Sequence, residues 1–173
     1  MVSQTTKLRV FFDMDGTLAE WRACEQYEML YEKGYFRTLQ PHPSVVKAAK
    51  LLADTGLVEV FSLSAVLPDG LHAIPDKNEW LDEHMPWLDI EHRIFVKGTS
   101  PKHEVVPGGI RENDILLDDY TKNCVEWDEH AIAIKLMNGI NGTQGTWQGA
   151  KVSRFETPED IMGFILKQGG VIR

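Results

Sequence analysis

The sequence predicts an α/β fold, a three-layer, Rossmann-like parallel sheet of about five strands with helices on both faces. Short apolar runs rich in β-branched and aromatic residues recur along the chain, and segments with helical periodicity separate several of them. Such alternation is typical of parallel sheets, because consecutive parallel strands are joined by a crossover that is usually a helix. The runs assigned to strands are residues 8–12, 58–63, 93–96, 114–117 and 131–136.

Capping signals mark two of the helices. Pro43 begins an apolar segment with helical spacing, and Gly56 lies beyond its end. Residues 157–160, Thr-Pro-Glu-Asp, form a capping-box start, and the helix that follows is expected to stop at Gly169. The apolar faces of both helices are expected to pack on the sheet.

The first strand ends in two aspartates, Asp13 and Asp15, followed by Gly16. Side chains two positions apart share a face while a strand persists, and glycine permits a sharp turn directly after it. Carboxylates held this close repel each other unless a cation neutralises them or one keeps its proton. A calcium loop is not indicated, because residues 17–24 supply no further oxygen ligands in register.

Residues 19–42 interrupt the alternation, and we expect a small helical cap there, inserted into a core of residues 1–18 and 43–173. Its aromatic side chains either stack on a flat substrate group or only pack the cap onto the core, and the sequence leaves both readings open. These aromatic residues are Trp21, Tyr27, Tyr31, Tyr35 and Phe36.

The segment 138–149 is rich in glycine but follows a strand and leads to no helix. A phosphate-binding loop normally opens a helix, so this segment is weak evidence for one. We expect a surface hairpin or an ordered loop instead.

Polar residues follow three of the predicted strands. The first ends in Asp13 and Asp15, the second runs into Ser64, and the fourth runs into Asp118 and Asp119. In an open parallel sheet, ligands bind beyond the carboxyl ends of the strands, near the point where the strand order reverses. Oxygen ligands suit Mg²⁺, which commonly shares its coordination shell with a substrate phosphate. The sequence therefore predicts a magnesium and phosphate site at this edge.

A lysine is needed to offset the charge of the phosphate. Asp76 resembles an N-cap with Glu79 at N3, which places Lys77 in a first helical turn, where the macrodipole disfavours a positive charge. This misfit makes Lys77 the first candidate, against the alternative of a solvated surface lysine. Lys102, after the third strand, is the competing candidate, and Lys97 is a third.

Composition and charge bound the class of protein. The 173 residues fit one domain, and the net charge of −8 opposes nonspecific binding to nucleic acid or to anionic membranes. Cys24 and Cys124 are too few and too far apart in sequence for a disulfide framework. The sparse cysteines favour a reducing compartment, and residues 1–6 are polar and lead directly into the first strand, so we expect a cytoplasmic protein. We expect a monomer or a homodimer.

In combination, the motifs resemble those of the haloacid dehalogenase-like phosphohydrolases. Residues 13–17, Asp-Met-Asp-Gly-Thr, match the first motif, Ser64 the second, a lysine the third, and Asp118 with Asp119 the fourth. The resemblance extends over residues 8 to about 166.

The 5′(3′)-deoxyribonucleotidase branch is the nearer resemblance. Residues 34–41 are similar to the segment that leads into the second helix of that branch, and residues 77–84 to its motif-three helix. The spacing of 13 from Ser64 to Lys77 also fits. The resemblance thus assigns the motif-three lysine to Lys77 and leaves Lys102 at a second basic position near the phosphate.

Two departures from the branch concern the substrate. The segment after Asp15 is shorter than the cap that encloses nucleotides there, and Tyr120-Thr121 replaces the usual basic or proline residue. Trp21 and Phe36 match positions that line the base pocket in the branch.

The resemblance implies roles for the candidate residues. Asp13 would attack phosphorus, Asp15 would act as acid and then as base, and Asp119 would position Lys77 or a metal-bound water. The residues implied are, for catalysis, Asp13, Asp15, Ser64 and Lys77; for the metal, Asp13, Asp15, Asp118 and Asp119; and for the substrate, Gly16, Trp21, Phe36, Ser64, Ala65 and Lys102.

We therefore expect a Mg²⁺-dependent phosphomonoesterase that acts through an aspartyl-phosphate on small phosphorylated substrates, foremost (deoxy)nucleoside monophosphates. A phosphatase of sugar phosphates, a phosphoacceptor switch and a non-catalytic nucleotide-binding module are the alternatives. The switch is disfavoured, because an acid/base partner such as Asp15 beside the phosphorylated residue would shorten the life of its phosphoryl group.

Overall fold

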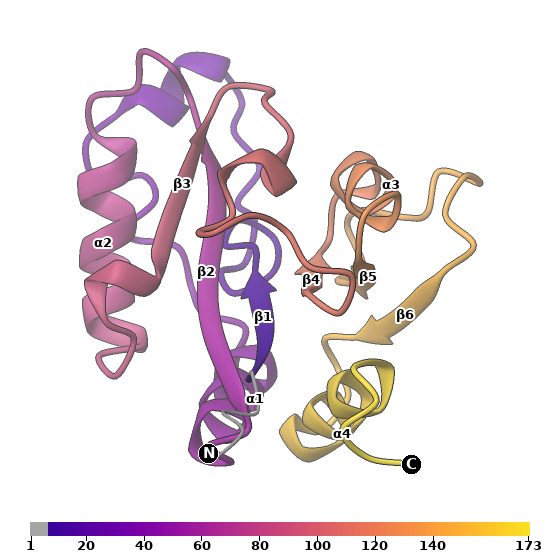
Figure 1. Cartoon of the computed structure of the whole chain (residues 1–173). Helices are drawn as coiled ribbons and strands as arrows, with labels where there is room; N and C mark the ends of the chain where they lie inside the picture. The colour runs from indigo at the N-terminus through magenta and orange to yellow at the C-terminus, as the bar shows by residue number, and fades with distance from the viewer. Residues whose placement is uncertain (1–6) are drawn as a thin grey trace.

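A computed structural model describes residues 7–173 of the chain, and its strands form one parallel sheet in the order β3-β2-β1-β4-β5-β6 (Figure 1). The predicted fold class is confirmed, with one strand more than expected. That strand, β6, has a single buried residue, Val152, which explains its weak signal in the sequence. Residues 1–6, which we expected to be a polar start, lie outside the described residues. The strands are β1 (Leu8–Phe12), β2 (Val58–Val66), β3 (Arg93–Lys97), β4 (Ile115–Asp118), β5 (Ile132–Met137) and β6 (Ala150–Ser153).

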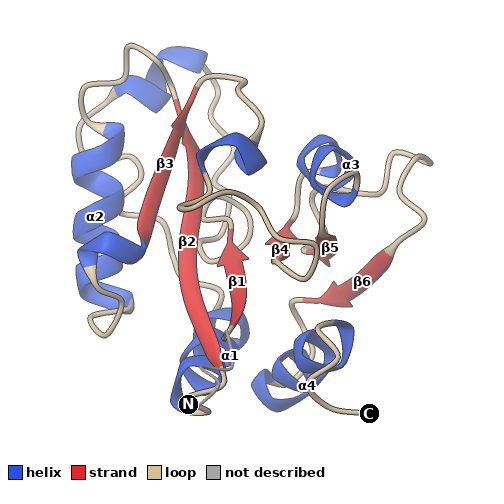
Figure 2. Ribbon diagram, in the orientation of Figure 1, coloured by secondary structure: helices blue, strands red, loops and turns tan. Residues whose placement is uncertain are grey.

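Helices cover both faces of the sheet (Figure 2). One face packs against α1 (Pro43–Asp54), α2 (Ala73–His84) and α4 (Pro158–Gln168), and the other against α3 (Thr121–Asp128). The 3₁₀ turns are η1 (Tyr27–Tyr31), η2 (Ile90–His92) and η3 (Lys102–Val105). The predicted start of α4 is confirmed, since the Thr157 hydroxyl accepts a hydrogen bond from the Asp160 amide at 3.1 Å.

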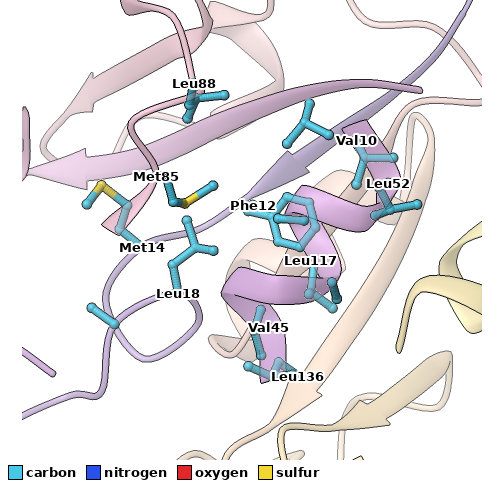
Figure 3. Close-up of a cluster of buried hydrophobic side chains, with 14 of the residues drawn as sticks. Val10, Phe12, Met14, Leu18, Val45, Leu52, Met85, Leu88, Leu117 and Leu136 are labelled. Atoms are coloured by element: carbon cyan, nitrogen blue, oxygen red, sulfur yellow. The ribbon is translucent and has the colours of Figure 1, made fainter. Parts of the chain in front are cut away.

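Alternation along β1 divides the core between the two faces. Val10 and Phe12 point toward α1, where they pack with Val45 and Leu52 (Figure 3). Phe11 points to the opposite face and belongs to the cluster beneath α3. All five residues of β1 are buried, as expected for the centre of a parallel sheet, and four of them are apolar; the exception is Arg9, which forms an ion pair with Asp114.

The start of α2 differs from the prediction. The helix begins at Ala73, three residues before Asp76, so Asp76 is not its N-cap. Pro75 fits in the first turn because the amides there have no partner within the helix. The buried carboxylate of Asp76 instead accepts a hydrogen bond from the Gly34 amide at 2.7 Å, which ties the helix to the segment before α1. Lys77 therefore lies in the second turn, where the helix macrodipole has little effect on a positive charge.

The segment 19–42, the expected cap, has η1 as its one regular helical turn and is packed firmly onto the core. Tyr35, Phe36 and Leu39 are buried in the cluster beneath α1 and α2, and the Trp80 indole donates to the Leu39 carbonyl at 2.8 Å. Its division from the core as a separate unit stays a prediction. Within residues 7–173, no helix combines the length and apolar character needed to cross a bilayer.

The order of the strands fixes where a ligand can bind. From β1 the chain continues to β2 and β3 on one side, whereas β4, β5 and β6 extend the sheet on the other. This reversal opens a crevice beyond the carboxyl ends of β1 and β4, the usual ligand site of an open α/β sheet.

Candidate active site

Three aspartates meet at the carboxyl ends of β1 and β4. Phe12 of β1 pairs with Leu117 of β4, and the Asp13 amide donates to the Leu117 carbonyl at 3.0 Å, so the residues that follow both strands are neighbours. Asp13, Asp118 and Asp119 are all buried, and each offers one carboxylate oxygen within 4.8 Å of the others. The structure thus brings together the strand-end acids on which the sequence argument depended.

Lys102 bridges two of these acids from η3. Its ammonium lies 2.5 Å from Asp13 Oδ1 and 2.7 Å from Asp118 Oδ2, and the side chain is buried. Burial acts to lower the pKa of Lys102, but the charges of Asp118 and Asp13 outweigh it and raise that pKa above its usual value. Lys102 therefore carries a permanent positive charge beside the candidate nucleophile.

Lys77 organises the other half of the site. Its ammonium donates to Asp15 Oδ2 at 2.5 Å, to the Ser64 hydroxyl at 2.7 Å and to the Ala65 carbonyl at 3.2 Å. The side chain is fully buried and lies 4.5 Å from the centre of the Phe36 ring, so the alternative of a solvated surface lysine is wrong. Its bonding partners do not include Asp119, which is held by other residues.

Asp15 keeps one oxygen free. While Oδ2 is bound by Lys77, the buried Oδ1 has no hydrogen-bond partner among the described residues. A buried carboxylate oxygen without a partner is costly unless a ligand completes its hydrogen bonding. Oδ1 therefore has acceptor capacity left for a ligand in the cavity that Asp15 lines.

Gly16 is required where the chain leaves β1. It has φ +87°, and a Cβ atom there would lie 2.3 Å from Asp119 Oδ2. Both the backbone conformation and the close approach of Asp119 depend on the missing side chain. The sequence predicts the turn but not this contact.

Neutral groups hold the carboxylate of Asp119. Its Oδ2 accepts from the amides of Asn138 at 2.8 Å and Asn141 at 2.5 Å. Burial and the neighbouring charge of Asp118 raise the pKa of Asp119 to about 6, although these amides act in the opposite direction.

The acids are suited to a metal ion. Burial raises the pKa of Asp13, and repulsion from Asp118, Asp119 and Asp15 raises it further, against the opposing charge of Lys102. Carboxylates that repel one another this strongly would be stabilised by a further cation, and hard oxygen ligands suit Mg²⁺. The Asp15 carboxylate is not in the cluster of three.

Two adjoining cavities open over the acids. The first, of about 380 Å³, contains Asp13, Asp15 and Asp119 in its wall. The second, of about 410 Å³, is mainly apolar and is lined in part by Tyr27 and Phe36. The residues shared by both cavities are Asp15, Trp21 and Ala65.

Four residues that hold the acids were not predicted from the sequence. The buried Lys135 donates to the main-chain carbonyl of Asp119, and the amides of Asn138 and Asn141 bind its carboxylate. Asn123 donates to Asp118 Oδ2 at 2.9 Å. Asn138 directly follows β5, so the strand-end argument could have found it, and a lysine within the apolar run of β5 was a second available signal.

Comparisons with known proteins point to a family. The family model of the 5′ nucleotidase, deoxy (Pyrimidine), cytosolic type C protein matches residues 17–152, which is more than half of the chain. The match includes Ser64 and Lys77 and begins directly after the Asp13 to Gly16 turn.

Two curated relatives, both from Staphylococcus epidermidis, are provisionally named 5′(3′)-deoxyribonucleotidases. The protein of strain RP62A is 26% identical over 114 residues, which cover 66% of this chain and 57% of the relative. The protein of strain ATCC 12228 is 32% identical over 68 residues, which cover 39% of this chain and 36% of the relative. The aligned region therefore spans less than two thirds of the length of either relative.

Proposed function

Because the chain belongs to the 5′ nucleotidase, deoxy (Pyrimidine), cytosolic type C family, we propose that it is a Mg²⁺-dependent phosphomonoesterase that dephosphorylates (deoxy)nucleoside monophosphates. The observation that carries the proposal is the group of three buried carboxylates, Asp13, Asp118 and Asp119, with oxygens within 4.8 Å of one another. The names of the two relatives support the same reaction and substrate class.

The proposed metal ligands are Asp13, Asp118 and Asp119 with the main-chain carbonyl of Asp15. A divalent cation bound there would screen the negative charge of the phosphoryl group, so that a carboxylate can approach it. Lys102 opposes the rise in the pKa of Asp13 and orients its carboxylate. The Ser64 hydroxyl, which donates a long bond of 3.4 Å to the Ala65 carbonyl, would turn to donate to a phosphoryl oxygen.

Asp13 is the proposed nucleophile. One of its carboxylate oxygens forms a bond to phosphorus while the ester P–O bond breaks, and the leaving alkoxide takes a proton from Asp15. A water then attacks the aspartyl-phosphate and gives its proton to Asp15, which releases phosphate and restores Asp13. The free Oδ1 of Asp15 supports this role, because Lys77 already occupies Oδ2.

The apolar cavity supports a nucleotide over a sugar phosphate. Trp21 and Phe36 lie in its wall next to Asp15, and aromatic side chains bind flat, apolar faces such as that of a nucleobase. A sugar, which is covered in hydroxyls, would find few hydrogen-bonding side chains there. The phosphate would lie over the acids and the base in the apolar cavity.

Phosphate release from a panel of nucleoside and deoxynucleoside monophosphates and sugar phosphates tests the proposal, with Mg²⁺ and with a chelator. We expect turnover of the nucleotides that needs the metal and disappears in Asp13→Asn, whereas Asp128→Asn, at an exposed position, keeps the parent rate. Turnover in purified Asp13→Asn at the parent rate, or binding of nucleotides without any hydrolysis, would contradict it.

A further inference from the structure

We propose that Asn138 and Asn141, on the loop after β5, are positioning residues that hold Asp119 as the principal anionic ligand of the metal. The inference rests on the proposed metal site and goes beyond it, because it assigns a function to a loop for which the sequence predicted none. We call residues 138–142 the β5 arm.

Asn138 is held in a single orientation. Its amide nitrogen donates to Asp119 Oδ2 at 2.8 Å and to the Gly16 carbonyl at 2.9 Å, and its amide oxygen accepts from the backbone amides of Ile140 and Asn141, both at 2.9 Å. The hydrogen-bonding capacity of the side chain is thus used in full. A flipped amide would place its oxygen against the oxygens of Asp119 and Gly16, so the side chain of Asn138 has one orientation.

The two amides together fix how Asp119 is presented. Both donate to Oδ2, whereas Oδ1 accepts only a long contact of 3.3 Å from the Thr17 hydroxyl. Oδ1 is therefore the oxygen of Asp119 with acceptor capacity left for a cation. The hydroxyl of Thr121 donates to the Gly142 carbonyl at 3.0 Å, which ties the end of the arm to the start of α3.

The chemistry of the donors distinguishes Asp119 from the other acids. Lys102 binds the carboxylates of Asp13 and Asp118, and Lys77 binds that of Asp15. Within the described part of the chain, the Asp119 carboxylate is bound by neutral groups alone. A lysine beside a carboxylate competes with a metal ion for its charge, whereas an amide orients the carboxylate and leaves that charge available.

Removing a donor of the β5 arm should therefore lower the affinity for the metal without changing the rate of the chemical step. Groups that orient a metal ligand typically change affinity or activity by about 10- to 100-fold when they are removed. We expect Asn141→Ala to weaken Mn²⁺ binding, without substrate, by about tenfold. Asn141→Leu, which keeps the volume of the side chain but removes the donor to Oδ2, should weaken it to a similar extent.

Titration of the purified protein with Mn²⁺, followed by calorimetry or by the electron paramagnetic resonance of free Mn²⁺, tests the proposal. Gln148→Ala is the matched control, because it removes an exposed amide from the same loop. In turnover assays, the variants at Asn141 should need more Mg²⁺ for half-maximal rate, while kcat at saturating Mg²⁺ and nucleotide stays within about twofold of the parent.

Variants of the arm and variants of the metal ligands separate the role of the arm from the metal site itself. If Asp119→Asn loses Mn²⁺ binding but Asn141→Ala binds as tightly as the parent, the arm has no positioning role, and the proposed metal site stands. If neither Asp119→Asn nor Asp13→Asn changes Mn²⁺ binding, the metal site itself is wrong. Since Asn138 is buried and its replacement could disturb the fold, the half-buried Asn141 carries the test.

Discussion

Without metal, the protein should lose stability as the pH rises through the titration of Asp119. The pKa of this group is about 6 in the folded protein, against an ordinary value of 3.8. A raised pKa means that the folded state favours the protonated carboxyl. Its contribution to stability is therefore fully present below about pH 4 and is lost as the pH rises through 6.

The difference of about two pKa units corresponds to about 3 kcal/mol of unfolding free energy. Asp119→Asn removes the titrating group but can keep the hydrogen bonds to the arm through its amide oxygen. The stability of the variant relative to the parent should thus increase by about 3 kcal/mol between pH 4 and pH 8. The charge of Asp119 also contributes to the raised pKa of Asp13, so Asp119→Asn relieves Asp13 as well, which changes the difference in the same direction.

Urea unfolding followed by tryptophan fluorescence, at several pH values in the presence of a chelator, measures this difference. Asp128→Asn, at an exposed position, should give a flat difference from the parent over the same range. Adding Mg²⁺ at about 100 times its dissociation constant should stabilise the parent by about 2.7 kcal/mol. A difference between the parent and Asp119→Asn that is constant from pH 4 to pH 8 would refute the reasoning.

Two further substitutions test the frame of the site. Gly16→Ala should weaken Mn²⁺ binding and lower the melting temperature, because its Cβ would lie 2.3 Å from Asp119 Oδ2. Gly56→Ala is the control, because Gly56 also has positive φ but has nothing within 4 Å of the added Cβ, so this variant carries the backbone strain alone. Equal effects of the two substitutions would count against the close approach of Asp119. Arg9→Met should lower the free energy of unfolding in urea by about 3–5 kcal/mol, because it leaves Asp114 buried without its ion-pair partner. A loss below about 1 kcal/mol would show that water readily reaches Asp114 in the variant.

Much of the site could be predicted because it follows from topology. Asp13 and Asp118 end strands that are adjacent in a parallel sheet, and the carboxyl ends of such strands lie at one edge whatever the detailed packing. Pro43 and Thr157 mark helix starts through local chemistry, which the sequence carries directly. The meeting of Asp13 and Asp118 at one edge of the sheet and the starts of two helices could therefore both be predicted from the sequence.

What could not be predicted depends on tertiary contacts that no local pattern carries. Asp76 has the residue type of an N-cap, but its carboxylate is used by Gly34, 42 positions away, and the helix begins earlier. Lys102 was predicted to lie near the phosphate, but its bonds to Asp13 and Asp118 depend on a 3₁₀ turn that no signal in the sequence marks. The Asn-Gly pairs of the β5 arm are ordinary turn signals, so the contacts of Asn138 with Asp119 remain hidden until the turn is placed.

The charges of the site suggest an order of binding. With the carboxylates of Asp13, Asp15, Asp118 and Asp119 all ionised, the site carries one more negative charge than the ammonium groups of Lys77, Lys102 and Lys135 offset. A phosphate dianion approaching this site would be repelled, and the overall charge of −8 offers no compensation at long range. One divalent cation reverses the sign locally. On the proposed mechanism we therefore expect the metal to bind before the substrate. The proposed role of the β5 arm would favour that order, because amide donors position a metal ligand without adding the positive charge of a fourth lysine.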